Sequence, residues 1–239
     1  MAGAKVLVLG ATGPAGICLL RECLYRNHET LAFVRNPSKI PADLVPNPLL
    51  TVIKGELTDT DALSTAVAQA TVVVSLLGPN TMRGFNPETY YDFYKALFQQ
   101  MRVHGVRRIF AMSTLSYPLP EDSFSLKRLL IVGLVRTVVP LGYQTVFRIC
   151  QAFLDHADGL DWTVYRIAGI PGASDQASWR EDREDGEAFE GWVGALGWTM
   201  SQRRGALARW LVDAVEDGKS QWIRKMPAVS RLAGSPRRA

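Results

Sequence analysis

Three glycines stand at close spacing near the start of the chain, in the segment Gly10-Ala-Thr-Gly13-Pro-Ala-Gly16. The segment follows a short apolar run and opens a stretch with a helical pattern. In that context Gly10 allows a tight turn, Gly13 lets the backbone approach a pyrophosphate, and Gly16 lets the helix pack closely on the strand. The free N–H groups of the helix N-terminus favour an anion. The alternative is a glycine-rich turn without a ligand. The residues predicted to bind a dinucleotide here are Gly10, Thr12, Gly13, Pro14, Ala15 and Gly16.

The end of the second predicted strand carries a basic residue, Arg35, where an enzyme selective for NAD usually has Asp or Glu. An acidic side chain there binds the ribose 2′-hydroxyl, whereas a guanidinium holds a 2′-phosphate and stacks on adenine. Lys39 can add a second cation. The alternative is that Arg35 is only a solvated surface residue. The pattern predicts NADP(H) rather than NAD as the cofactor.

The elements that must position these residues alternate between short apolar runs and helical patterns over the first 113 residues. Continuous apolar runs are typical of parallel strands covered on both faces by helices. The predicted fold class is therefore α/β, a doubly wound parallel sheet of the Rossmann type. The predicted strands are Val6–Leu9, Leu31–Val34, Leu50–Ile53, Thr71–Leu77, Val106–Met112 and Trp162–Ile167. The predicted helices are Ile17–Tyr25, Asp59–Gln69, Pro87–His104, Leu126–Val139, Tyr143–His156 and Arg203–Glu216.

The second half of the chain is less regular. Residues 169–200 are rich in glycine, tryptophan and acidic residues and predict a loop, and Gln221–Arg224 is predicted to form the last strand. No linker separates two independent units. Residues 1–239 are therefore predicted to form a single NAD(P)-binding domain, with residues from about 165 to 239 as a small C-terminal subdomain on the substrate side.

Composition excludes several other classes of protein. The chain has 239 residues, of which 47% are hydrophobic and 21% charged, which argues against a mainly disordered chain. No apolar run reaches the roughly 18 residues of a membrane span, so no membrane partner is expected. Three scattered cysteines and three histidines predict no disulfide framework and no metal site. The net charge is +4, but no aromatic residues interleave the basic ones, so no nucleic-acid partner is expected. No secretion signal is recognised, and the expected location is cytoplasmic.

Further segments match one family. They are Gly10–Gly16, Val34–Lys39, Gly55–Asp59, Ser75–Pro79, Arg108–Thr114, Gly159–Arg166 and Met200–Leu211. Together they resemble the atypical short-chain dehydrogenase/reductase superfamily, in its NmrA-like or NAD(P)-binding branch. The resemblance spans nearly the whole chain and is specific for fold and cofactor class. It implies that Glu56 and Leu57 lie by the adenine, that Leu77 and Gly78 line the cofactor, and that Ser113 belongs to the active site.

Redox members of this family use Tyr-x-x-x-Lys on the helix after the fifth strand. The tyrosine exchanges a proton with the substrate, and the lysine lowers the tyrosine pKa and holds the ribose. The one such spacing here, Tyr91 to Lys95, precedes the fifth strand and is better explained by chance. Counting back from Asp161 puts Arg148 near the lysine position, and arginine lacks the tunable pKa of lysine. The candidate catalytic residues are Ser113, Tyr117, Tyr143 and Arg148.

These patterns predict an NADP(H)-dependent enzyme that transfers hydride to or from a carbonyl or conjugated alkene of a small apolar molecule. The missing Tyr-x-x-x-Lys keeps two alternatives open. One is a non-catalytic NmrA-like regulator that senses NADP, and the other is an NADP-dependent isomerase or epimerase in which hydride leaves and returns. A homodimer through the helix at residues 87–104 is a further expectation from the resemblance.

Overall fold

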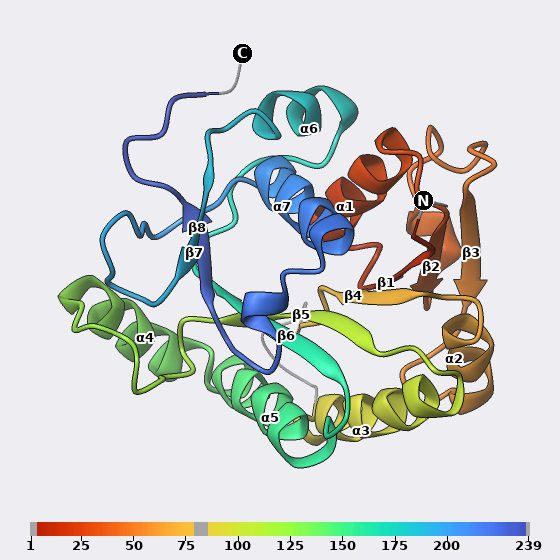
Figure 1. The fold of residues 1–239 in the computed structure, drawn as a ribbon, viewed down its shortest axis with the longest axis horizontal. Helices are drawn as coiled ribbons and strands as arrows, with labels where there is room; N and C mark the ends of the chain where they lie inside the picture. The colour runs from red at the N-terminus through yellow and green to blue at the C-terminus, as the bar shows by residue number, and fades with distance from the viewer. Residues whose placement is uncertain (1–3, 79–85, 238–239) are drawn as a thin grey trace.

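The computed structural model describes residues 4–78 and 86–237 (Figure 1). Within them, eight strands form one sheet in the order β3-β2-β1-β4-β5-β6-β8-β7, with β7 antiparallel to β8 and the other neighbouring pairs parallel. The predicted doubly wound α/β sheet is confirmed. The strands are β1 (Val6–Leu9), β2 (Thr30–Val34), β3 (Leu50–Lys54), β4 (Val72–Ser75), β5 (Arg108–Thr114), β6 (Asp161–Ile167), β7 (Ala188–Gly191) and β8 (Ala228–Arg231). The helices are α1 (Pro14–Tyr25), α2 (Thr60–Val67), α3 (Glu88–Val103), α4 (Leu126–Val138), α5 (Pro140–His156), α6 (Gln176–Asp182) and α7 (Arg204–Asp217).

The order of the strands fixes where a ligand can bind. β1 pairs with β2 on one side and with β4 on the other, so the direction of winding reverses at β1. In open α/β sheets, ligands bind outside the carboxyl ends of the strands at this switch point. Every residue of β1, β2 and β4 is buried, which explains why these strands are apolar except at Thr30 and Ser75.

Helices cover both faces of the sheet (Figure 1). α1, α6 and α7 pack together on one face, and α2, α3 and α5 cover the other. α3 and α5 meet through aromatic rings, including Phe98 and Phe153 with centroids 4.8 Å apart. α4 differs from the other helices, because none of its residues is buried and it packs mainly on α5.

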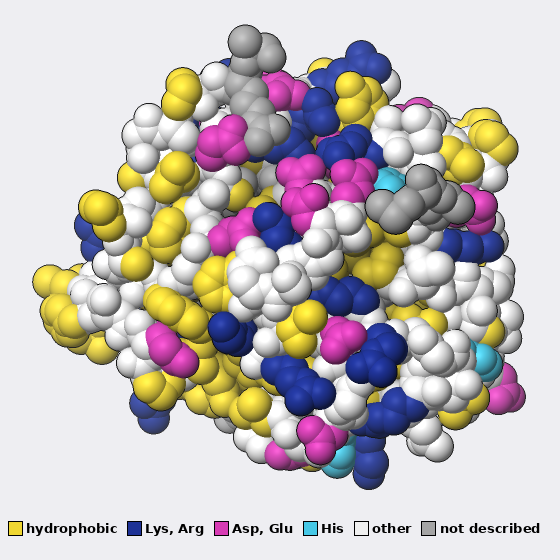
Figure 2. All heavy atoms as spheres, viewed as in Figure 1, with side chains coloured by type: hydrophobic (Ala, Val, Ile, Leu, Met, Phe, Trp, Pro, Cys, Tyr) yellow, Lys and Arg dark blue, Asp and Glu magenta, His cyan; other side chains and the backbone are white. Residues whose placement is uncertain are grey.

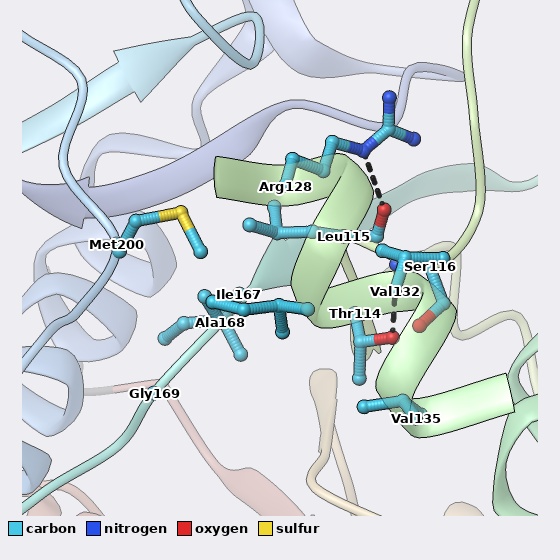
Figure 3. A pocket seen from close by; sticks show the side chains of 11 residues that line it. Thr114, Leu115, Ser116, Arg128, Val132, Val135, Ile167, Ala168, Gly169 and Met200 are labelled. Carbon is cyan, nitrogen blue, oxygen red and sulfur yellow. Dashed lines mark hydrogen bonds between the residues drawn. The ribbon is translucent and has the colours of Figure 1, made fainter. Parts of the chain in front are cut away.

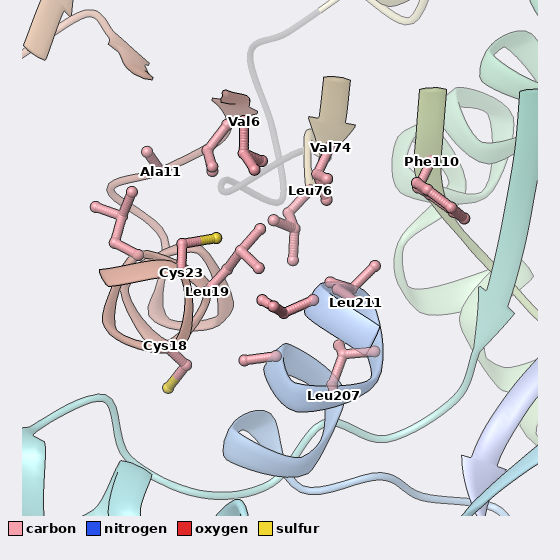
Figure 4. Close-up of a cluster of buried hydrophobic side chains, with 14 of the residues drawn as sticks. Val6, Ala11, Cys18, Leu19, Cys23, Val74, Leu76, Phe110, Leu207 and Leu211 are labelled. Atoms are coloured by element: carbon pink, nitrogen blue, oxygen red, sulfur yellow. The ribbon is translucent and has the colours of Figure 1, made fainter. Parts of the chain in front are cut away.

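The contact between α1 and α7 joins distant parts of the chain. Leu19 and Cys23 of α1 lie in one buried apolar cluster with Leu207 and Leu211 of α7 (Figure 4). Burial of such side chains contributes roughly 1.5–3 kcal/mol each. The cluster fixes the position of α1, which carries the glycine turn at its N-terminus.

Polar contacts and ion pairs also join α1 to α6 and to α7. Glu22 of α1 is fully buried and accepts hydrogen bonds from Trp179 Nε1 at 3.1 Å and from Arg183 Nη2 at 2.9 Å. Arg26 donates to Asp213 of α7 at 3.0 Å and also pairs with Glu216. A buried carboxylate is tolerated only when it is paired in this way, so α1 depends on residues that follow it by more than 150 positions.

Two predictions for the C-terminal region are wrong. Residues 169–200 are not one loop, because α6 forms where Asp175 caps it through the N–H groups of Ala177 and Ser178, and β7 follows. The last strand is β8, not Gln221–Arg224, which the structure places in a 3₁₀ turn and its exit. Positive φ angles at Lys219 and Arg224 interrupt any strand there.

Among the described residues, no single helix is long and apolar enough to cross a membrane. α4 and α5 together have the length and apolar composition of a membrane span, but the chain bends by 111° between them.

Candidate functional site

The glycine turn has the geometry that a close-approaching ligand requires. Gly10 adopts a φ of +80°, and a Cβ there would lie 2.9 Å from the Leu76 backbone. A Cβ on Gly16 would lie 2.2 Å from the Gly10 carbonyl oxygen, so only glycine lets α1 pack against the turn. A Cβ on Gly13 meets nothing closer than 3.4 Å. Gly10 and Gly16 are therefore required because a side chain there would clash with nearby backbone atoms, whereas Gly13 leaves space open to a ligand.

The N-terminus of α1 is free to bind an anion. Gly13 caps the helix in an extended conformation, and no side chain accepts from the first turn. Pro14 occupies the first helical position and lacks an N–H, which leaves those of Ala15 and Gly16 as donors. Thr12 lies in the same turn. Uncapped N–H groups at the positive end of a helix dipole suit a pyrophosphate, so the residues present fit the phosphates of a dinucleotide.

The two basic residues predicted to bind the 2′-phosphate follow β2. Arg35 and Lys39 are both exposed, and they flank a short turn that Asn36 closes by accepting from the Ser38 N–H at 3.1 Å. The ring of Tyr90, on α3, lies close enough to Arg35 for the cation to oppose the rise that burial causes in the Tyr90 pKa. The Arg35 guanidinium therefore stands near the start of α3, on the carboxyl side of the sheet.

The remaining predicted cofactor residues follow β3 and β4. Glu56 is exposed and Leu57 is half-buried, directly after Gly55, whose N–H donates to the Val34 carbonyl at 3.1 Å. Leu77 and Gly78 are half-buried and follow β4. Pro79, which closes the matched segment, lies outside the described residues. All four residues thus stand at the carboxyl ends of strands, the same edge as the glycine turn.

Ser113 lies at the end of β5 but points into the protein. Its Oγ is 3.2 Å from Cys150 Sγ on α5, and the residue is buried. Burial raises the pKa of the Cys150 thiol to about 12, so this thiol stays protonated. The Ser113 hydroxyl is therefore held against α5 and is buried.

Tyr117 and Tyr143 lie beside the same aromatic side chain of α5. Both pack on Phe147, with ring centroids 5.1 Å and 4.7 Å from its ring. Positions 143, 147 and 150 share one face of α5, since they are four and three residues apart. The residue four positions after Tyr143 is Phe147, so a Tyr-x-x-x-Lys spacing that began at Tyr143 would have phenylalanine in place of lysine.

Arg148 lies on a different face of α5. Its guanidinium forms an ion pair with Glu88 and lies 4.4 Å from the centroid of the Tyr91 ring. Both partners belong to α3, so Arg148 joins α3 to α5 and is turned away from the aromatic group of Tyr117, Tyr143 and Phe147.

A cavity of about 370 Å³ opens beside the ends of β5 and β6 (Figure 3). α4 forms one wall of it and the ends of the two strands form the other, with Met200 opposite α4. The lining is Thr114, Leu115, Ser116, Arg128, Ile131, Val132, Val135, Ile167, Ala168, Gly169 and Met200. Most of these side chains are apolar, and the two hydroxyls come from Thr114 and Ser116. Such a lining suits a small apolar molecule with one polar group.

Buried charges hold the loop between β5 and α4. Arg166 of β6 is fully buried and donates to both carboxylate oxygens of Asp122, at 2.6 Å and 2.7 Å. Arg128 donates from Nε to the Leu115 carbonyl at 2.8 Å (Figure 3) and lies 3.6 Å from Asp122. The charge of Asp122 opposes the fall that burial causes in the Arg128 pKa. The network thus fixes the part of the pocket wall that Arg128 forms.

The chain was compared with known proteins. A profile of the NAD(P)H-binding family matches residues 10–217. An 84-residue stretch is 34% identical to a 3-beta-hydroxysteroid dehydrogenase of Mycolicibacterium neoaurum; it covers 33% of this chain and only 22% of that enzyme. A short-chain dehydrogenase/reductase of Veillonella parvula, solved with NADP, superposes with a TM-score of 0.73 at 17% identity, over 96% of this chain and 95% of that one. An anaerobillin reductase of Escherichia coli superposes with a TM-score of 0.62 at 14% identity, over 97% and 98%.

The family profile spans the glycine turn, every parallel strand from β2 to β6 and the two helices α1 and α7 that pack together. Both solved structures share the fold over nearly their whole length. A nicotinamide cofactor is the ligand that this family binds, and the turn fits it. The chain therefore belongs to the NAD(P)H-binding family, and its fold is of the Rossmann type.

Proposed function

We propose that the protein is an NADP(H)-dependent oxidoreductase that transfers hydride between the nicotinamide and a carbonyl or conjugated alkene of a small apolar molecule. The observation that carries this proposal is the placement of a mostly apolar 370 Å³ pocket at the same edge of the sheet as the glycine turn. Bound NADPH would supply the hydride from C4 of its nicotinamide. The NADP complex of the Veillonella parvula structure supports the choice of cofactor.

The chain's own residues have distinct tasks in this proposal. Ala15 and Gly16 donate backbone hydrogen bonds to the pyrophosphate, and Arg35 pairs with the 2′-phosphate. The pocket walls exclude water from the reacting carbon, which favours an apolar substrate. Thr114 and Ser116 are placed to hold its polar group. Ser113 supports this strand end from below, where Cys150 holds its hydroxyl.

Tyr117 or Tyr143 would deliver the proton that completes a reduction. Burial raises the pKa of Tyr117 above its ordinary value near 10. The phenol therefore stays neutral at physiological pH and acts as an acid rather than a base. Phe147 stands four residues after Tyr143, so no cation occupies that position of the helix. The arrangement favours reduction over oxidation.

Replacing Arg35 with alanine is expected to remove the preference for NADPH. NADPH should bind the wild type at least about tenfold more tightly than NADH, a difference of ~1.4 kcal/mol, and the variant should bind both equally. Tryptophan fluorescence titration measures both constants. The matched control is Arg107→Ala, which removes an exposed arginine immediately before β5, at the opposite end of the strand. An unchanged preference in Arg35→Ala would show that Arg35 does not contact the 2′-phosphate.

Removing the correct phenol is expected to lower the rate of reduction by about 10²–10⁴-fold. Tyr117→Phe and Tyr143→Phe keep their rings on Phe147, so the fold and NADPH affinity should not change. The measurement is NADPH consumption in a screen of carbonyl and enone compounds. Because burial raises the Tyr117 pKa, the wild-type rate should stay level up to about pH 9 if Tyr117 is the donor. If both variants keep wild-type turnover, neither tyrosine donates the proton.

A second function is favoured by one observation. Phe147, rather than a lysine, stands four residues after Tyr143, and Arg148 forms an ion pair with Glu88 on α3. A protein that binds NADP(H) without turning it over, and reports its presence to a partner, needs the glycine turn but not a proton donor. Tight NADPH binding with no turnover across the screen would support this sensor function over the reductase.

A further inference from the structure

An apolar surface on α4 is the largest group of exposed hydrophobic side chains among the described residues. We call it the α4 patch. It consists of Phe124, Leu126, Leu129, Leu130, Ile131, Leu134 and Val138, each at least 45% exposed. α4 stands at the edge of the molecule, away from the sheet (Figure 1), and Figure 2 shows hydrophobic side chains gathered over that edge. A contiguous exposed patch of this kind marks an interaction surface.

The opposite face of the helix is already in use. Arg128, Val132 and Val135 are half-buried and line the pocket. α4 therefore forms a wall that has the pocket on one side and the α4 patch on the other. Of the α4 patch, only Ile131 also lines the pocket, so packing inside the protein does not explain the rest of the apolar outer face.

The charge on α4 itself is one-sided. The helix carries three basic residues, Lys127, Arg128 and Arg136, and no acidic one. Leu126, Leu129, Leu130 and Leu134 form one stripe along the helix. At 100° per residue, Lys127 and Arg136 lie about 90° to either side of the centre of this stripe. Both are exposed. An apolar stripe with a basic side chain on each flank matches the requirements of an anionic lipid surface, where stripe residues enter the acyl boundary and the cations meet headgroups.

We propose that the α4 patch docks the protein on the surface of an anionic lipid bilayer. The 13 residues of α4 extend over only about 20 Å, less than the roughly 30 Å of a hydrocarbon core, so the helix lies in the interface and does not cross it. A second copy fits the patch less well. A two-fold contact would bring Lys127 and Arg136 of both copies together, and no carboxylate lies within the patch to pair with them.

Docking in this way has a consequence for the substrate, which rests on the proposed function. The pocket would open directly beneath the inserted helix, next to the acyl chains. Its substrate class would then be molecules that partition into lipid and enter the pocket from the bilayer, without crossing water.

Co-sedimentation with vesicles tests the docking without using catalysis. One set of vesicles contains phosphatidylcholine alone, and the other an equal mixture of phosphatidylcholine and phosphatidylglycerol. The wild type is expected to bind the mixed vesicles and to bind phosphatidylcholine at least about tenfold more weakly. Leu130→Glu with Leu134→Glu should lower binding to mixed vesicles by about tenfold or more. Lys127→Glu with Arg136→Glu should remove the preference for anionic lipid.

The matched control is Val103→Glu with Leu196→Glu, which adds the same charges at exposed apolar residues outside the patch. It should bind like the wild type, and all variants should melt at the wild-type temperature. Absence of binding to both vesicles, or equal loss in the control, would overturn the proposal. So would a dimer in light scattering that Leu130→Glu with Leu134→Glu dissociates, since a second copy would then cover the patch. None of these outcomes depends on turnover, so failure of the reductase proposal remains distinguishable.

Discussion

Replacing Gly13 with valine is expected to abolish NADPH binding while the protein remains folded. Gly13 has a φ of −75° and a ψ of 158°, an extended conformation that valine adopts readily. The nearest heavy atom to a Cβ there is 3.4 Å away, so the fold has room for it. The added methyl groups would instead occupy the space over the first N–H groups of α1, where a pyrophosphate must approach. We expect affinity to fall by about 100-fold or more, about 2.7 kcal/mol.

The matched variant is Gly16→Val in the same turn. Its Cβ would lie 2.2 Å from the Gly10 carbonyl oxygen, so α1 itself must move. Gly16→Val should therefore lower the melting temperature, whereas Gly13→Val should not. Calorimetry and fluorescence titration separate the two effects. If Gly13→Val binds NADPH like the wild type, the cofactor does not pass over this turn.

Replacing Asp122 with asparagine is expected to destabilise the fold by about 3–5 kcal/mol, because it leaves the buried Arg166 guanidinium without its counter-charge. Asp122 also accepts from the backbone N–H groups of Leu119 and Val193, so one carboxylate joins three segments. Asp161→Asn is the control, since its pair with Arg107 is exposed and worth at most about 1 kcal/mol. Denaturant unfolding measures both. Equal effects of the two substitutions would contradict the role given to the buried pair.

The same carboxylate predicts how stability depends on pH. Burial alone would raise the pKa of Asp122, but the hydrogen bonds and charge of Arg166 outweigh burial and lower it. A carboxyl whose folded pKa is lowered contributes stability above its unfolded value of about 3.9, and that contribution is lost as the pH falls toward the folded value. Acid unfolding of the wild type should therefore be steeper below about pH 4 than that of Asp122→Asn.

The cofactor half of the site could be predicted from sequence because each part of it is local. The spacing of Gly10, Gly13 and Gly16 specifies a turn within seven residues, and Arg35 follows a strand whose apolar run is unmistakable. Such signals need no knowledge of distant contacts. The strand order that places them on one edge follows from the regular alternation of strands and helices.

The catalytic half could not be predicted in the same way. The face of α5 that carries Tyr143 and Phe147 is set by where the helix ends, at His156, and by a turn of four residues before β6. A difference of one residue in counting backward through that turn would turn a side chain by about 100° around the helix. The pocket is likewise formed by residues from four segments that are separate in the sequence. α6, β7 and β8 are short, and their pairing partners are not visible in their own sequences.

The packing of α1 on α7 also sets an order of events during synthesis. A ribosome releases the glycine turn first and α7 last, yet Leu19 and Cys23 of α1 have their apolar partners on α7. Until α7 has emerged, Arg26 has no Asp213 or Glu216, and the nascent α1 exposes a surface that chaperones recognise. Nucleotide binding is therefore expected late in biogenesis, and a chain whose translation stops before α7 is not expected to bind nucleotide.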